Sequence, residues 1–111
     1  MITEVTSYEI ERKMAEKEIV NKILKYLKDI PMCFCWKEHG GMYGTTGIPD
    51  IICCFRGHFV AFEVKTEKGR LTKLQSVALE KINAAGGKAY KVTSLDEVRA
   101  ILKNLEECEW I

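Results

Sequence analysis

The stretch Gly47–Lys65, GIPDIICCFRGHFVAFEVK, decides the fold of this chain. It holds two runs of mostly apolar residues, 50–55 and 58–65, joined only by Arg56 and Gly57. Two strand-like runs separated by two residues that include a glycine are typical of a β-hairpin. The sequence therefore predicts two antiparallel strands with a tight turn between them.

This turn sets the register of the hairpin. Asp50 then faces Glu63 on the neighbouring strand, with Cβ atoms about 4.5–5.5 Å apart, and Lys65 shares the face of Glu63 because strand side chains alternate. Directly opposed like charges destabilise a sheet, and both strands are otherwise apolar on both faces. A carboxylate in such surroundings is paired, protonated or bound to a metal ion. The pair thus predicts a divalent-cation site, although acids near strand ends are also common as solvated ends.

Length and composition are those of an ordinary globular protein. Of the 111 residues, 47% are hydrophobic and 30% are charged. This length predicts one domain. Residues 1–12 are expected to be weakly ordered. A net charge of +1 argues against a protein that simply coats DNA. It does not argue against a nuclease, whose acidic metal ligands cancel part of its basic surface.

The sequence shows neither a membrane span nor a metal-binding cysteine pattern. We find no apolar run of about 20 residues and no signal-peptide core near the N-terminus, so a cytoplasmic protein is expected. The five cysteines form no CxxC pair, and we expect them to be small buried hydrophobic residues in a reducing compartment.

The remaining periodicity predicts a mixed α/β fold. A strand–helix–strand unit after the hairpin implies a parallel pair with a right-handed crossover, and helices would flank the sheet. The expected elements are a helix over about 13–30, strands over 32–37, 50–55 and 58–65, a helix over about 73–85, a strand over 88–92 and a helix over 95 to about 105. The order is therefore α-β-β-β-α-β-α.

The first helix carries a candidate third acid. Its apolar stripe ends at Leu27, and Glu16 extends this stripe by one turn, whereas Glu18 falls on the polar face. Glu16 has two explanations that the sequence leaves open. Acids are favoured near helix N-termini, and the helix could also aim Glu16 at the Asp50–Glu63 pair.

The second helix begins with a capping box. Thr72 and Gln75 fit the T-x-x-Q pattern, which explains Gln75 structurally, although its amide could also reach the acidic pair. The predicted packing face of this helix is Leu74, Val77, Ala78, Ile82 and Ala85. Before the hairpin, residues 38–47 contain four glycines and form a predicted loop that could close over a substrate.

These residues resemble a known nuclease family. Pro49-Asp50, followed after a strand's length by Glu63-Val64-Lys65, looks like the PD-(D/E)xK nuclease signature. More narrowly, Gly47 to Asp50, Glu63 to Lys65 and the downstream Gln75 resemble the VRR-NUC (virus-type replication-repair nuclease) family, over about residues 13–105. The resemblance implies a restriction-endonuclease-like mixed β-sheet flanked by helices.

The resemblance also implies a role for each matched residue. Asp50, Glu63, the backbone carbonyl of Val64 and Glu16, with Glu18 as the competing acid, would hold Mg²⁺ or Mn²⁺. Lys65 would orient or help deprotonate the attacking water, or stabilise the phosphate in the transition state. Gln75 would position a ligand or the water.

Small stand-alone members of the family resemble Holliday-junction resolvases, which are typically homodimers from phages. We therefore expect a metal-dependent DNA endonuclease selective for branched DNA, Holliday junctions or flaps, that serves phage replication, recombination or repair as a homodimer. Its phosphate contacts would include Lys68, Arg70 and Lys73. The alternatives are a nuclease-fold protein that binds nucleic acid without cutting, a nuclease that needs a partner, and an unrelated small α/β protein with surface acids.

Overall fold

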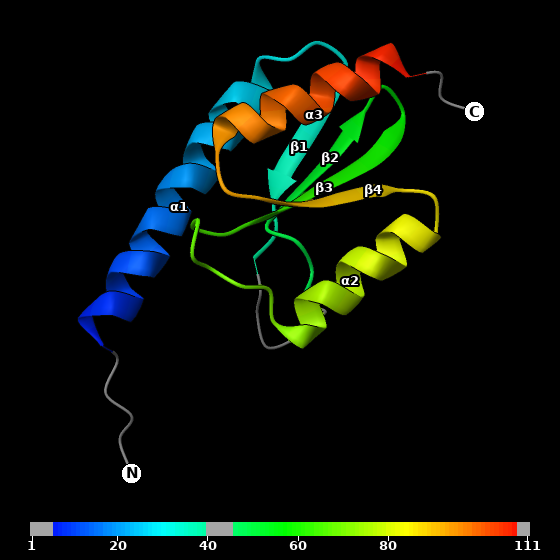
Figure 1. Ribbon diagram of the computed structural model, residues 1–111. Coiled ribbons are helices and arrows are strands. Elements are labelled where there is room, and N and C mark those ends of the chain that lie inside the picture. Colours follow the sequence, from blue (N-terminus) through cyan, green and yellow to red (C-terminus); the bar gives the residue numbers. More distant parts are fainter. Residues whose placement is uncertain (1–5, 40–45, 109–111) are drawn as a thin grey trace.

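The computed structural model describes residues 6–39 and 46–108. Within these residues, no helix combines the length and the apolar character that crossing a membrane requires. The elements, labelled in Figure 1, are α1 (Ser7–Lys28), β1 (Cys33–Lys37), β2 (Ile51–Phe55), β3 (His58–Val64), α2 (Lys73–Ala84), β4 (Lys88–Val92) and α3 (Leu95–Glu107). This order is the predicted one.

The four strands form one mixed sheet in the order β1-β2-β3-β4. The pairs β1–β2 and β2–β3 are antiparallel, and β3–β4 is parallel, with α2 as the crossover helix. In Figure 1, α1 and α3 lie on one side of the sheet and α2 on the other. The prediction of a mixed sheet flanked by helices is confirmed.

The hairpin has the predicted turn and register. Arg56 and Gly57 both have positive φ, 51° and 85°, as the two central residues of a type I′ turn do. Phe55 pairs with His58, and Ile51 pairs with Phe62 at the other end of the ladder. The next residues along the two strands are Asp50 and Glu63.

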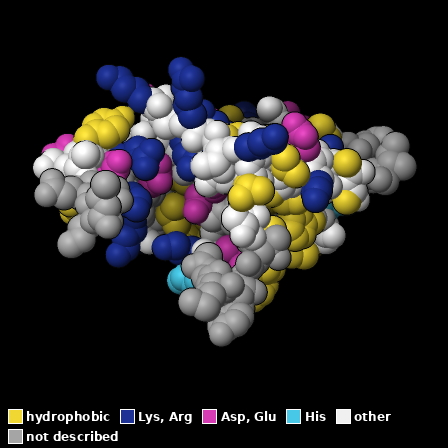
Figure 2. Space-filling view, turned by 90° about the horizontal axis from the view of Figure 1, so that it is seen from below, with side chains coloured by type: hydrophobic (Ala, Val, Ile, Leu, Met, Phe, Trp, Pro, Cys, Tyr) yellow, Lys and Arg dark blue, Asp and Glu magenta, His cyan; other side chains and the backbone are white. Residues whose placement is uncertain are grey.

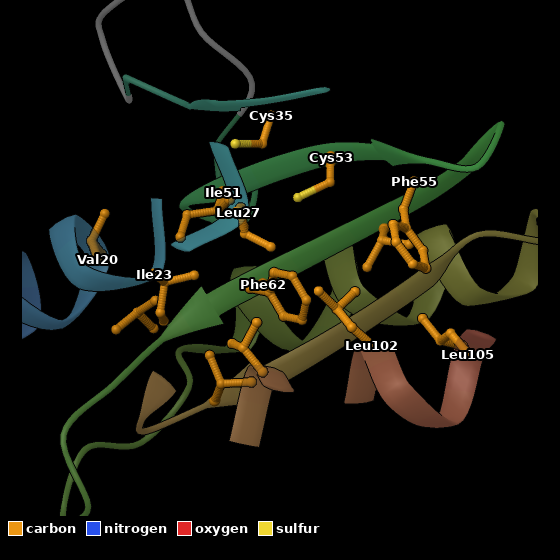
Figure 3. Packing of buried hydrophobic residues seen from close by; sticks show 14 residues of the cluster. Val20, Ile23, Leu27, Cys35, Ile51, Cys53, Phe55, Phe62, Leu102 and Leu105 are labelled. Atoms are coloured by element: carbon orange, nitrogen blue, oxygen red, sulfur yellow. The ribbon is translucent and has the colours of Figure 1, made fainter. Parts of the chain in front are cut away.

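The main core lies between the sheet and the helices α1 and α3. Val20, Ile23 and Leu27 of α1 lie in one buried cluster with Phe62, and Leu27 lies beside Phe62 in Figure 3. Leu102 and Leu105 of α3 lie in the same cluster. On the opposite face a smaller cluster, Ile52, Ala61, Leu79 and Ala89, joins the sheet to α2. Because α2 covers only part of this face, the remainder stays accessible.

The first helix begins earlier than expected. The Thr6 hydroxyl oxygen accepts a hydrogen bond from the Glu9 backbone N–H (3.1 Å) and caps the helix, which starts at Ser7. Of residues 1–12, which were expected to be weakly ordered, residues 7–12 form the first turns of α1. A threonine that satisfies one of the free N–H groups is a favourable helix start.

Two other predictions need correction. The Thr72–Gln75 capping box is present, but the buried residue of α2 is Leu79, and Leu74 is 54% exposed.

Of the cysteines, Cys35 and Cys53 are buried, whereas Cys54 and Cys108 are exposed. Burial raises the pKa of the Cys53 thiol far above its ordinary value.

Truncating the core-facing stripe of α1 tests the packing. Leu27 is fully buried, so Leu27→Ala should lower the free energy of unfolding by about 2–5 kcal/mol in urea denaturation. Leu74→Ala, the same change at an exposed position of α2, should alter it by no more than about 0.5 kcal/mol. Equal effects of the two substitutions would contradict the assignment of the buried faces.

Candidate active site

The structure places Asp50 and Glu63 in direct contact at the end of the hairpin. The Asp50 backbone N–H donates to Glu63 Oε2 (3.3 Å), and the Val64 backbone N–H donates to Asp50 Oδ2 (2.8 Å). These reciprocal bonds continue the pairing of β2 and β3 beyond the last ladder pair. Pro49, which has no N–H to offer a strand, is buried directly before Asp50.

The pair is electrostatically strained without a cation. Glu63 is only 2% exposed and is the buried charged residue of the described core. Burial, the hydrogen bond to Asp50 and the charge of Asp50 raise the pKa of Glu63 from 4.5 to about 8, against the opposing effect of the Lys65 charge. Glu63 therefore carries a proton at neutral pH when no cation is bound.

Lys65 joins the pair as the sequence predicted. It follows β3 directly, is half-buried, and its backbone N–H donates to the Val92 carbonyl (3.0 Å) at the end of β4. Its positive charge acts on Glu63. The Val64 side chain packs into the core on the opposite face, so what this residue can offer the site is its backbone.

Gln75 lies next to the segment that leads into Asp50. A Cβ at Gly47, whose φ is +85°, would stand 2.6 Å from the Leu74 carbonyl oxygen and 3.2 Å from the Gln75 backbone nitrogen. Glycine is therefore required where this loop crosses the first turn of α2. The Gln75 side-chain oxygen accepts from the Thr72 N–H (2.9 Å) in the capping box, which leaves the amide N–H groups as its contribution to a site.

Neither helix acid is assembled with the pair. Glu16 is half-buried on α1, whereas Glu18 is exposed. Among residues 6–39 and 46–108, no three His, Cys, Asp or Glu side chains lie close enough to share a metal ion. The structure thus favours Glu16 over Glu18 as the inward acid but does not bring it to Asp50 and Glu63.

The sheet adds two residues that sequence reasoning missed. Glu38 extends β1 opposite Asp50, since its N–H donates to the Asp50 carbonyl (2.8 Å), and Lys91 pairs with Glu63 in the parallel ladder. The Glu38 carboxylate accepts from Trp36 Nε1 (2.6 Å), so it is held along β1. Sequence reasoning missed Glu38 because the pairing register of β1 with β2 could not be predicted. A glycine-rich segment, rather than a short turn, joins β1 to Asp50.

Lys and Arg side chains lie near this end of the sheet (Figure 2). Figure 2 shows acidic side chains near the middle of the face, with Lys and Arg side chains gathered toward one side. The predicted phosphate contacts Lys68, Arg70 and Lys73 are all exposed. Of the predicted glycine-rich loop 38–47, residues 40–45 lie outside the described residues.

The donor set fits a hard divalent cation. Mg²⁺ usually retains several waters and is held by one or two carboxylates together with substrate phosphates. Asp50 and Glu63 supply two carboxylates in a mutually repulsive arrangement, with Lys65 beside them. A cation that displaces the Glu63 proton would offset the repulsion between the two carboxylates and would compensate the buried negative charge of Glu63.

The raised pKa gives a pH dependence of stability with a defined sign. Between pH 4.5 and about 8 the metal-free folded protein holds a proton on Glu63 that the unfolded chain releases, so the free energy of unfolding should fall as pH rises through this window. Denaturant titrations in EDTA should show this fall, and Glu63→Gln should reduce it. At pH 7.5, Mg²⁺ or Mn²⁺ at about 100 times its dissociation constant should stabilise the wild type by ~2.7 kcal/mol and release protons. Identical pH slopes for wild type and variant would contradict the burial of this carboxyl.

Comparison with known proteins identifies the fold. No protein-family model matches the sequence, and no curated protein matches it. Among solved structures, the chain is similar to a "VRR_NUC domain protein" (TM-score 0.66, 17% identity, covering 79% of this chain and 84% of that one). It is also similar to a "VRR_NUC domain" (TM-score 0.68, 20% identity, 80% and 95%). The protein therefore has the fold of VRR-NUC domains, as the motifs around Asp50 and Glu63 predicted.

Proposed function

We propose that this protein is a metal-dependent DNA endonuclease that hydrolyses phosphodiester bonds. The observation that carries the proposal is the opposition of Asp50 and the buried Glu63, whose carboxylates accept reciprocal backbone hydrogen bonds and have the Lys65 charge beside them. A purely structural role would not require two opposed carboxylates inside an apolar sheet. The fold likeness to VRR-NUC domains supports the same reading.

The residues divide the chemistry between them. A bound Mg²⁺ or Mn²⁺ would supply a more acidic water and charge stabilisation at the scissile phosphate. Asp50 and Glu63 would hold the cation, with the Val64 carbonyl as a further oxygen donor. The Lys65 ammonium would orient the attacking water and neutralise charge on the phosphate in the transition state. The Gln75 amide would position the water or a ligand, and Glu16 would contribute through bound water.

The proposed substrate is branched DNA read through its shape and phosphates. The exposed cations Lys68, Arg70 and Lys73 lie on the segment that leads from the Lys65 end of β3 into α2. Phosphate contacts of this kind fix the position of a protein on DNA but carry no sequence information. The preference for junctions or flaps, and a role in phage DNA replication, recombination or repair, rest on the family resemblance.

We further propose that the protein acts as a homodimer through the part of the sheet that α2 leaves uncovered. We name this surface the β1 face; its exposed apolar side chains are Met32 (73% exposed), Phe34 (71%), Trp36 (41%) and Phe59 (46%). Phe34 and Trp36 lie 5.8 Å apart between ring centroids. A hollow of about 450 Å³ beside Met32 and Phe34 offers a place for a protruding side chain.

The area of the β1 face matches what a second copy would need. At 150–250 Å² for a fully exposed large side chain, the exposed fractions of the four residues correspond to roughly 350–580 Å². A stable interface buries about 800 Å² per partner, and homodimer interfaces are about 65% apolar. Arg56, the cation beside the hollow, already pairs with Glu106 (3.7 Å). A two-fold dimer would present two active sites to the two strands of a junction.

Cleavage of defined DNA structures tests the nuclease proposal. With Mg²⁺ or Mn²⁺, the wild type should cut a four-way junction or a flap faster than plain duplex. Asp50→Asn, Glu63→Gln and Lys65→Ala should each lower the rate by about 10³-fold or more, since the metal site contributes several kcal/mol to catalysis. Binding measured in EDTA should persist in the first two variants.

The control is Glu80→Gln, the same chemical change at an exposed position of α2, which should cut like wild type. Glu63→Gln cutting at the wild-type rate would disprove the proposed metal site. Binding without cutting under all conditions would favour the non-cutting alternative or a requirement for a partner.

The oligomeric state tests the β1 face. Light scattering of the wild type should give the mass of two chains, and Phe34→Asp should raise the dimer dissociation constant at least ~30-fold, the effect of losing a central aromatic residue. Leu74→Asp, at an exposed leucine outside the β1 face, should leave it unchanged. A monomeric wild type, or dimers that persist in Phe34→Asp, would refute this interface.

A further inference from the structure

A groove lies between the first turns of α1 and the loop that follows β3. It has a volume of about 510 Å³, within the range of small-ligand sites. Its lining residues come from three parts of the chain: Tyr8, Glu11, Arg12 and Ile19 of α1, Thr66, Glu67 and Lys68 of the loop, and Thr93 after β4. The groove exists because α1 begins at Ser7 and brings residues of its first turns to the loop.

The groove opens at the end of the sheet that carries the candidate active site. Thr66 and Lys68 follow Lys65 in sequence, and the bond from the Lys65 N–H to the Val92 carbonyl (3.0 Å) joins the start of this loop to the end of β4, next to Thr93. In Figure 2 the cations that flank the central acidic side chains gather toward the α1 side of this face. A strand held at the carboxylates could therefore continue into the groove.

Arg12 has a buried hydrogen-bond donor without an acceptor among the described residues. Its Nε is buried and has no hydrogen-bond partner among the described residues, although the side chain lines the groove. A buried guanidinium nitrogen without an acceptor is unfavourable. A phosphate can accept two parallel hydrogen bonds from a guanidinium, and Lys68 lines the same groove as a second cation.

The other lining residues argue against a channel that binds a row of phosphates. Glu11 and Glu67 also line the groove, so its charge suits one phosphate beside Arg12 and Lys68 rather than a row of them. Tyr8, 61% exposed, offers an aromatic ring on which a base can stack. Stacking of this kind is open to a base whose faces are free, as in single-stranded nucleic acid.

We propose that this groove binds one unpaired nucleotide of the DNA substrate, with its base on Tyr8 and its phosphate on Arg12 and Lys68. The Thr66 hydroxyl group provides hydrogen bonds to the sugar or the base edge, and the Thr93 hydroxyl oxygen, whose proton is donated to the Glu97 carboxylate, can accept one. The inference rests on the proposed nuclease function and specifies the substrate: the DNA carries a single-stranded segment beside the cleaved bond. This gives a physical basis for preferring flaps and open junctions to plain duplex.

Binding of a short fluorescein-labelled thymidine oligonucleotide, followed by polarisation in EDTA, tests the groove independently of cleavage. Tyr8→Ala should weaken binding about 5- to 150-fold, the range expected for loss of one stacked base, and Tyr8→Phe should restore it. Arg12→Ala should weaken binding by at least about 10-fold, as for loss of a charged hydrogen bond, with partial recovery in Arg12→Lys. The control is Lys17→Ala, an exposed cation of α1 that lines a different hollow.

Each outcome decides the proposal. Wild-type affinity in both Tyr8→Ala and Arg12→Ala would overturn it, and so would a loss in Lys17→Ala as large as theirs. Competition by thymidine monophosphate as effective as that by the oligonucleotide would show a free-nucleotide site and overturn the strand assignment. A protein that cuts no DNA but shows the predicted losses would uphold the groove and contradict cleavage by this chain alone. A protein that cuts DNA with unchanged Tyr8 and Arg12 variants would refute the groove alone.

Discussion

The opposition of Asp50 and Glu63 across β2 and β3 is the constraint on which the rest of the site depends. A shift of one residue in this pairing would turn every side chain of one strand to the other face of the sheet. It would separate the carboxylates and expose a core residue, Phe55 if β2 turned or Phe62 if β3 turned. The tight turn at Arg56 and Gly57 prevents such a shift. Folding of the core and assembly of the acidic pair are therefore set by the same register.

The two faces of the sheet have different structural roles. Against α1 and α3 the strands contribute large side chains to a closed core, which holds the hairpin rigid. Against α2 they contribute small residues, Ala61 and Ala89, which let this helix lie close over β3 and β4. Asp50, Glu63 and Lys65 share the α2 face, so the helix that follows the motif lies on the side of the sheet where the carboxylates are placed.

The site sits where regular pairing ends. Beyond the last ladder pair of β2 and β3, backbone N–H groups bond to the carboxylates of Asp50 and Glu63 instead of to carbonyl groups. These bonds hold the acids in place, while burial keeps the pKa of Glu63 near 8. A rigid pair with one readily displaced proton is suited to exchange that proton for a cation without rearranging the sheet.

The sequence by itself determined the elements, the hairpin register and the meeting of Asp50, Glu63 and Lys65. Each of these follows from local signals: a two-residue turn, alternation along strands, and the capping box at Thr72. Only the tertiary structure decided where the helices present their side chains. The packing of α2 against distant strands buries Leu79 rather than Leu74. The packing of α1 separates Glu16 from the acidic pair and forms the groove at Arg12. A helical pattern fixes which residues share a face, but contacts far apart in the chain fix what that face meets.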